Sequence, residues 1–401
     1  MHRRTLLATG AAAIAGFPEI VRAETVGVTA TEIKIGHTIA YSGPASSYGV
    51  IGKGHVAYFK RLNEQGGIAG RKINFISLDD SYLPPKTVEQ VRRLVEQDQV
   101  ALLFNTLGTP TNSAIHRYVN QKKVPHLFVS TGADKWANPK EFPWTIGFQP
   151  SYRTEAQIYA KYIVKERPGA KAALIYQNDD FGKDYLLGLQ EALGADFNKV
   201  FIKVLTYEPS DATIDSQAVT MKEAGADVLV TAAIPKFAAQ MIRKAFDMAW
   251  KPLHFMSNVS SSVGSVLTPA GPEKAIGMLT SAYTKDPTDP TWKNDAGMNE
   301  WRAFMAKYIP DGDVTDGSYG FSYSCCRTLE QVLRQCGNDF SRENIMKEVA
   351  NIHDLELPLL LPGIKINTSP TNFHPIKQMQ LSRWTGTTWE LFGGIIEGAG
   401  A

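Results

Sequence analysis

Hydrophobic residues along this chain fall into two alternating patterns. Short runs rich in Val, Ile, Leu and Phe predict strands, and the longer segments between them, where apolar residues recur at helical spacing, predict helices. In the first part of the chain, strands and helices are predicted in turn at residues 32–39, 48–63, 72–78, 84–97, 100–104, 111–121 and 125–130. This alternation is typical of a parallel sheet with helices on both faces.

The alternation starts again after about residue 150. Helices and strands are predicted in turn at residues 154–167, 171–177, 182–193, 200–207, 216–224, 228–233, 236–249 and 254–257. Two consecutive sets predict two α/β lobes, each with its own sheet. The last quarter differs, with helices predicted at 319–336 and 342–349 and strands at 364–366, 377–384 and 388–392.

The first 23 residues have the pattern of an export signal. Arg3 and Arg4 precede an apolar stretch at residues 6–17, which is too short to cross a bilayer, and a small-residue cleavage site ends at Ala23. The weak hydrophobicity of the stretch and the arginine pair favour the twin-arginine route, with an ordinary Sec signal as the alternative. We therefore expect a periplasmic protein.

Charge and cysteine content narrow the possible partners. Removing residues 1–23 takes away three arginines and one glutamate, so the formal net charge falls from +2 to zero. A neutral chain has no general attraction for nucleic acid or anionic lipid. Cys325, Cys326 and Cys336 lie in one predicted helix, where their spacing disfavours a disulfide, and no His/Cys spacing typical of a metal site is present. We expect no metal, no cofactor and no nucleic-acid partner.

Motifs typical of catalysis are missing from the sequence. It contains no Gly-x-Ser-x-Gly elbow, no phosphate-binding P-loop and no His-Glu-x-x-His pair. An exported hydrolase or reductase would need a nucleophile–base pair or a cofactor loop in its cleft. The sequence therefore favours a binding protein over an enzyme.

Small polar loops follow three predicted strands of the first lobe. They cover residues 41–48, 105–111 and 130–133, and each leads into a helix or a helical turn. Because ligands of open α/β sheets bind at the carboxyl ends of the strands, these loops can face one cleft. Backbone N–H groups at helix starts suit a carboxylate or another oxygen-rich group.

A family resemblance extends this interpretation. Ile33-Lys-Ile-Gly, Tyr41-Ser-Gly-Pro with Tyr48-Gly, Asn63-Glu-Gln-Gly-Gly-Ile-Ala-Gly70, Asp79-Asp80 and Asp180-Phe-Gly-Lys-Asp-Tyr185 resemble landmarks of the branched-chain amino acid-binding family of periplasmic proteins. The similarity runs across essentially the whole mature chain. It implies the type I periplasmic-binding fold, in which two Rossmann-like lobes are joined by three crossovers and hold a ligand between them.

The resemblance also implies lobe boundaries. Lobe 1 is expected to comprise residues 24–149 and 284–372, and lobe 2 residues 150–283 and 373–401. The crossovers then fall near residues 149–152, 283–286 and 372–374. The chain is expected to start in lobe 1, cross to lobe 2, return for the long helix and finish in lobe 2.

Site residues follow by the same resemblance. The carboxylate side corresponds to lobe 1 loops, Tyr48 stacks from lobe 1, and Phe181 closes from lobe 2. Ile234 and Asn258 lie in the lobe 2 loops where relatives that bind leucine-like ligands carry a Tyr and a Glu. The full set of expected ligand-binding residues is Tyr41, Tyr48, Gly108, Thr109, Ser130, Thr131, Gly132, Ala133, Phe148, Gln149, Phe181, Ile234 and Asn258.

The missing acid in lobe 2 shapes the ligand hypothesis. Without a counter-charge, burying the ammonium group of an amino acid would be costly. We therefore expect an aromatic or aliphatic carboxylic acid, with a branched-chain or other amino acid as one alternative and an amide- or urea-type ligand as another.

The expected mechanism is hinge closure of the two lobes over the ligand. The expected partner is the membrane permease of an ABC transporter with its ATPase, and the protein itself is expected to be a monomer. A ligand-sensing module that feeds a receptor would share the fold and remains an alternative.

Overall fold

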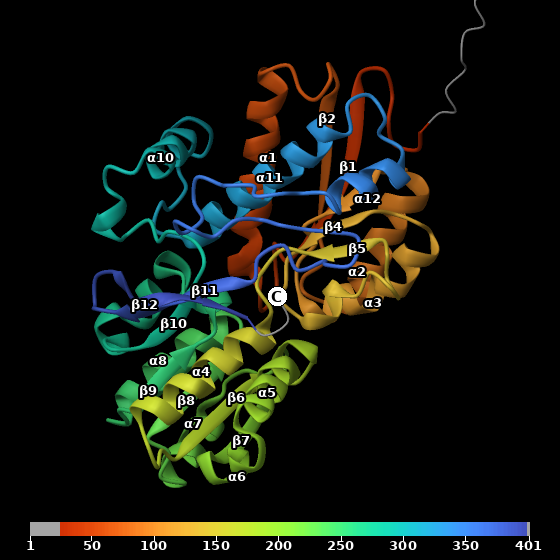
Figure 1. Cartoon of the computed structure of the whole chain (residues 1–401). Helices are drawn as coiled ribbons and strands as arrows, with labels where there is room; N and C mark the ends of the chain where they lie inside the picture. The colour runs from red at the N-terminus through yellow and green to blue at the C-terminus, as the bar shows by residue number, and fades with distance from the viewer. Residues whose placement is uncertain (1–24, 399–401) are drawn as a thin grey trace, which may run out of the picture.

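The computed structural model describes residues 25–398. Within them the chain forms two α/β lobes, one above the other in Figure 1, each built on its own sheet. This agrees with the two sets of strands and helices expected from the hydrophobic pattern. The predicted export signal, residues 1–23, lies outside the described residues.

The sheet of lobe 1 has five parallel strands in the order β2-β1-β3-β4-β5. Helices cover both of its faces, as expected for strands that are buried on both sides. The strands are β1 (Glu32–Ile39), β2 (Lys72–Asp79), β3 (Leu102–Phe104), β4 (His126–Val129) and β5 (Thr145–Gly147). The helices of this part of the chain are α1 (Gly49–Glu64), α2 (Pro84–Arg92) and α3 (Thr109–Gln121).

The sheet of lobe 2 has the order β12-β11-β10-β9-β8-β6-β7. Strands β6 to β10 are parallel, and the β11–β12 hairpin joins β10 as an antiparallel edge. The strands are β6 (Ala172–Gln177), β7 (Phe201–Tyr207), β8 (Val228–Ala232), β9 (Leu253–Met256), β10 (Leu279–Ala282), β11 (Gln378–Trp384) and β12 (Trp389–Glu397). The helices are α4 (Tyr152–Glu166), α5 (Asp180–Leu193), α6 (Phe197–Val200), α7 (Asp215–Glu223), α8 (Pro235–Asp247) and α9 (Thr268–Ala270).

The chain passes between the lobes three times. It leaves lobe 1 between β5 and α4, and returns after β10 to supply α10 (Ala296–Tyr308), α11 (Gly317–Gln335) and α12 (Arg342–Val349). It then re-enters lobe 2 at β11. Helix α11 packs along α1, which fixes the returning segment to lobe 1. The type I periplasmic-binding architecture therefore agrees with the structure.

Some elements of the structure were not predicted. Strands β5 and β10 have only three and four residues, but helix α10, with 13 residues, was missed as well. Residues 364–366 were predicted as a strand, but Ile366 forms only an isolated bridge with Leu355. The missed strand β10 matters most, because it leads into a crossover that borders the cavity described below.

Close packing of α1 on α11 depends on a glycine. A Cβ atom at Gly54 would lie 2.9 Å from Ser322 Cβ, closer than real side chains pack. Ser322 in turn donates a hydrogen bond to the Ile51 carbonyl, so the two helix backbones stay in contact. Cys325 and Cys326 lie on the same helix and are buried and free.

We predict that Gly54→Ala destabilises the protein. Overpacking of this kind costs about 1–3 kcal/mol, which exceeds the roughly 1 kcal/mol that alanine gains over glycine in a helix. Urea denaturation measures the free energy of unfolding. Lys53→Ala, one residue earlier on the exposed face of α1, is the matched control and should leave stability unchanged or slightly raised. Equal stability of the two variants would contradict this account of the helix contact.

Candidate functional site

A cavity of about 140 Å³ lies between the carboxyl-terminal strand ends of the two sheets. Parallel strands place their following loops at this edge, so the cavity is walled by loops and helix starts of both lobes. Eight of the ligand-binding residues expected from the sequence line this cavity: Tyr48, Gly108, Thr109, Ser130, Gln149, Phe181, Ile234 and Asn258.

The lobe 1 wall offers hydrogen-bond donors. Helix α3 begins at Thr109, and the first-turn N–H groups of a helix have no partner within it. Gly108 precedes the helix with φ of 93°, and a Cβ there would meet the Tyr82 ring, so only glycine fits. The Ser130 hydroxyl lines the cavity and has no hydrogen-bond partner within residues 25–398. An anion or another acceptor suits this wall.

The lobe 2 wall is held by a buried acid. Glu155 on α4 is fully buried and accepts hydrogen bonds from the Asn258 backbone N–H at 2.9 Å, the Asn258 side-chain amide, and the hydroxyls of Tyr159 and Tyr185. Burial raises the pKa of Glu155, and these hydrogen bonds oppose the rise. Glu155 is not among the cavity-lining residues, so the cavity meets Asn258 and not the carboxylate.

Aromatic rings form the remaining walls and join the lobes. The Tyr48 hydroxyl of lobe 1 donates to the Val259 carbonyl of lobe 2 at 2.8 Å. The Gln177 amide of lobe 2 donates to the Tyr82 hydroxyl of lobe 1 at 3.1 Å. Phe181 is 3% exposed, and its ring centroid lies 4.7 Å from that of Tyr152. The cavity is thus enclosed by lobes that touch across it.

Two residues expected in the site lie outside its lining. The Tyr41 backbone N–H bonds Asp79, and its hydroxyl bonds Ser77 at 2.6 Å, so the side chain turns toward β2. Phe148 packs in the core between Phe128 and Phe321. Successive residues of an extended segment point to opposite sides, which explains why Gln149 reaches the cavity while Phe148 does not.

Three further expected residues support the lobe 1 wall from behind. Thr131 shares a 2.6 Å hydrogen bond with the Thr109 hydroxyl and accepts the Ala133 backbone N–H. The Gly132 carbonyl accepts the Tyr152 backbone N–H, which ties this loop to the start of α4. These residues hold the wall in position without lining the cavity.

Sequence reasoning missed lining residues on the crossover after β10. Asp286 borders the cavity, and burial raises its pKa to about 6 despite hydrogen bonds from the Thr288 N–H and hydroxyl. Lys285 also borders the cavity but its ammonium is paired with Asp295 at 2.9 Å. The family resemblance placed a crossover near residues 283–286, but without a predicted β10 none of its side chains was assigned to the site.

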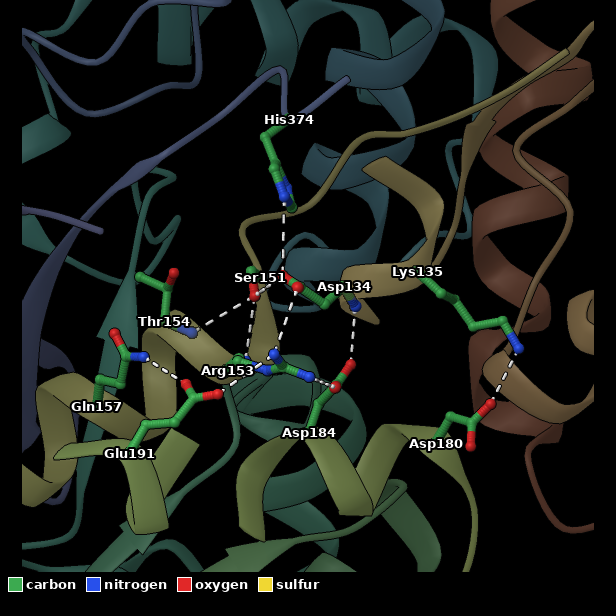
Figure 2. Close-up of polar contacts among 10 residues, drawn as sticks. All are labelled: Asp134, Lys135, Ser151, Arg153, Thr154, Gln157, Asp180, Asp184, Glu191 and His374. Atoms are coloured by element: carbon green, nitrogen blue, oxygen red, sulfur yellow. Dashed lines mark hydrogen bonds and ion pairs between the residues drawn. The ribbon is translucent and has the colours of Figure 1, made fainter. Parts of the chain in front are cut away.

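A polar network joins the lobes beside the first crossover (Figure 2). The Asp134 backbone N–H of lobe 1 donates to Asp184 of lobe 2 at 2.7 Å. Arg153 contacts Asp184 at 3.2 Å, and Lys135 pairs with Asp180 at 2.9 Å. Burial raises the pKa of Asp184 to about 6, with the nearby Asp134 charge adding to the rise.

The opposite flank is closed by close backbone approach. The Gly264 N–H of lobe 2 donates to the Thr315 carbonyl of lobe 1 at 3.1 Å, and the Ser262 hydroxyl donates to Asp316 at 2.9 Å. A Cβ atom at Gly264 would contact Asp313 and lie 3.0 Å from the Asp316 nitrogen. With both flanks bridged, the structure is a closed arrangement of the lobes.

Residues 25–398 contain no group of three or more His, Cys, Asp or Glu side chains arranged to hold a metal ion. In the same range, no helix has the length and apolar character needed to cross a membrane.

Comparison with known proteins identifies the class. A sequence profile of the periplasmic binding protein family matches residues 32–388, so the chain belongs to this family and is a periplasmic-type ligand-binding protein. It is 25% identical over 332 residues to the Leu/Ile/Val-binding protein homolog 3 of Brucella melitensis, covering 80% of this chain and 82% of that protein. The Brucella suis Leu/Ile/Val-binding protein homolog 1 is 24% identical over 329 residues, covering 79% of this chain and 82% of that protein.

Solved structures have the same fold. A branched-chain amino acid ABC transporter protein from Thermus thermophilus with bound valine gives a TM-score of 0.83 at 15% identity, covering 92% of this chain and 97% of that one. A fatty acid ABC transporter substrate-binding protein from Thermomonospora curvata gives 0.80 at 19% identity, covering 94% and 95%.

We predict that Asp184→Ala costs more stability than Lys135→Met. The Asp184 side chain is 10% exposed, and its loss leaves the Asp134 N–H without its acceptor, which costs about 1–3 kcal/mol. The Lys135–Asp180 pair is 34% and 46% exposed, and such pairs contribute about 0–1 kcal/mol. Urea denaturation of the unliganded protein compares the two. A larger loss for Lys135→Met would refute this ranking.

We predict that Gly264→Ala weakens ligand binding without lowering stability. The added Cβ clashes only where the lobes meet, so the closed form is disfavoured while each lobe keeps its own packing. Small-angle X-ray scattering should show a more open molecule. Gly394→Ala is the matched control, since a Cβ there meets nothing within 4 Å. A compact profile and unchanged affinity for Gly264→Ala would rule out the closed-state clash.

Proposed function

We propose that this protein is the solute-binding component of an ABC importer and that its ligand is a small carboxylic acid with an aromatic or aliphatic body. The observation that carries the proposal is the asymmetry of the cavity. Lobe 1 offers the start of α3 and a Ser130 hydroxyl that has no partner among the described residues. Lobe 2 offers apolar rings and an asparagine whose neighbouring acid is already hydrogen-bonded.

The lobe 1 wall supports the carboxylate. Thr109 is the first residue of a helix of 13 residues and borders the cavity. Pro110 has no N–H and the Asn112 N–H bonds the Gly108 carbonyl, so the helix start offers the Thr109 N–H and the positive end of the helix dipole. Ser130 adds a hydroxyl donor. Two oxygens of one carboxylate can accept from both sources, and hydrogen bonds to a charged group are among the stronger ones in proteins.

The lobe 2 wall supports an apolar body. Phe181, Ile234 and the Tyr152 ring border the cavity and provide apolar surface. At roughly 10–15 Å³ for each water-sized group, the cavity volume of about 140 Å³ admits about nine to fourteen heavy atoms. A benzoate- or phenylpropenoate-like acid has this size. The Thermus thermophilus structure contains bound valine, and the Thermomonospora curvata protein is described as a fatty acid substrate-binding protein. Both of these ligands carry a carboxylate.

An amino acid is the second candidate, and Asp286 favours it. This carboxyl borders the cavity and stands on the crossover that joins the lobes, so it can provide the counter-charge that the loops near Ile234 and Asn258 lack. Burial raises the pKa of Asp286 to about 6, so its surroundings disfavour the anion relative to water. The choice between the two ligand classes therefore depends on this one residue.

The proposed mechanism is capture by closure. The ligand binds the lobe 1 wall, and lobe 2 then closes through contacts such as Tyr48 to the Val259 carbonyl. A permease that recognises the closed form would receive the ligand in the periplasm. We further propose that the protein acts as a monomer and performs no chemistry on its ligand.

Titration calorimetry with benzoate, 3-phenylpropenoate, benzamide and leucine tests the ligand class. We expect the acids to bind and benzamide, which lacks the charge, to bind at least tenfold more weakly. Ser130→Ala should weaken acid binding by about tenfold or more, because it removes a donor to a charged group. Ser216→Ala, an exposed serine of lobe 2 far from the cavity, is the control.

Asp286→Asn separates the two candidates. If the ligand is a carboxylic acid, this variant should bind it as well as or better than the wild type, because a carboxyl that opposes the anion is removed. Strong leucine binding that is lost in Asp286→Asn would instead establish the amino acid candidate and overturn the proposal.

A further inference from the structure

The cavity continues past the lobe interface into a side compartment. Its floor is one face of the β10–β11–β12 edge of the lobe 2 sheet, where Ser382 pairs with Thr280 on one side and with Leu391 on the other. Trp389, two residues before Leu391, shares that face. Its roof is the crossover that follows β10, with Pro287 and Trp292.

The compartment lies far from the carboxylate wall. In the sheet order, Ile234 follows β8, and β12 stands four strand positions further along. At about 4.8 Å between neighbouring strands, the lining extends across roughly 19 Å of sheet. A ligand held by Thr109 and Ser130 can reach the compartment only if it is elongated.

The polar groups of the compartment floor already have partners inside the protein, whereas the indole N–H of Trp292 in the roof has none within the described residues. The Thr280 hydroxyl donates to the Met256 carbonyl at 2.9 Å, and the Ser382 hydroxyl to the Glu390 carbonyl at 3.2 Å. The Trp389 indole N–H donates to the Ser261 carbonyl at 2.8 Å. What remains for a ligand is mainly the apolar surface of rings and aliphatic groups.

The roof is held in place from both lobes. Lys285 bonds both carboxylate oxygens of Asp295 and the Pro358 carbonyl, and Thr288 contacts Thr388 of the hairpin at 3.4 Å. The compartment is therefore formed before a ligand arrives, and binding there does not require ordering of the crossover.

We propose that the side compartment binds the distal apolar tail of an elongated monocarboxylic acid, such as an arylalkanoic or medium-chain alkanoic acid. This inference rests on the proposed function, because it takes the carboxylate to be held by lobe 1. The carboxyl groups of Asp286 and Asp289 border the compartment, so a second carboxylate at the distal end of the ligand is disfavoured. The ligand class is thus monoacids rather than diacids of equal length.

A length series measured by calorimetry on the whole protein tests the tail. Benzoate, 3-phenylpropanoate and 5-phenylpentanoate share the carboxylate and the ring but differ in reach. Burying each added methylene should raise affinity by about fourfold. Octanoate should bind at least tenfold more tightly than octanedioate, and Asp286→Asn should narrow that difference.

Leu391→Trp fills the compartment and provides the site test. It should weaken 5-phenylpentanoate binding by tenfold or more while benzoate affinity stays within about twofold. Ile395→Trp is the matched control on the same strand, since Ile395 is 40% exposed and outside the lining. If Leu391→Trp does not fold, the affinities of the length series for the wild-type protein and the octanoate–octanedioate comparison in Asp286→Asn still test the proposal.

The outcomes separate the two proposals. If benzoate binds but affinity does not rise with length, or if Leu391→Trp weakens short and long acids equally, the side compartment has no such role and the proposed function stands. If none of the acids binds, the proposed function is wrong and this inference with it.

Discussion

The buried carboxylate of Glu155 is the constraint on which the architecture of lobe 2 depends. Burying an ion is costly unless hydrogen bonds compensate it, and here donors come from Tyr159, Tyr185 and Asn258. The Tyr159 oxygen also lies 2.8 Å from the Met256 carbonyl oxygen and accepts the Ser281 N–H. One acid therefore fixes α4, α5, β9 and β10 relative to one another at the edge where the cavity opens.

That constraint also determines what the cavity offers a ligand. Because the carboxylate is satisfied from within lobe 2, Asn258 is held with its backbone and amide turned to Glu155. Ile234 adds no charge, and the nearby Lys236 is not part of the lining. Among residues 25–398, the only acids in the lining reach it from the crossover after β10, at Asp286 and Asp289. The distribution of charge around the cavity therefore depends on where the acidic side chains are held, and not on how many acids the chain contains.

Local rules explain what the sequence could predict. Alternating hydrophobic periods located most strands and helices, and polar loops after three strands indicated one edge of a cleft, because parallel strands end at one edge. The family resemblance pointed to Gly108 and Thr109 within those loops. Tyr41, in the first loop, and Phe148, expected as an apolar wall, lie outside the lining. Tyr41 is drawn to Asp79 by a hydrogen bond across the sheet, and Phe148 stands on the opposite side of its segment from Gln149.

The residues that the sequence could not assign depend on long-range contacts. Tyr82 faces the cavity because Gly108 leaves room for its ring, a fact of two segments 26 positions apart. Asp286 and Trp292 border the cavity because β10, only four residues long, delivers the crossover to that edge. Glu155 looked like an ordinary helix residue, and its role appears only when Asn258 is brought beside it. These residues lie at or beside the cavity because of contacts between segments that are distant in the sequence, and their residue types alone do not reveal this.

Closure and binding are coupled by the same unpaired groups. In the closed form, the start of α3 and the Ser130 hydroxyl are withdrawn from water, and within the described residues the hydroxyl has no partner. Leaving such groups unsatisfied costs free energy, so closing an empty cleft is opposed by the very donors that bind a ligand. The contacts that bridge the flanks, from Gly264 to Thr315 and from Asp134 to Asp184, act in the other direction. A carboxylate that accepts hydrogen bonds from the lobe 1 donors removes the free-energy cost of burying them unsatisfied. The bridging contacts then favour closure of the lobes over the ligand.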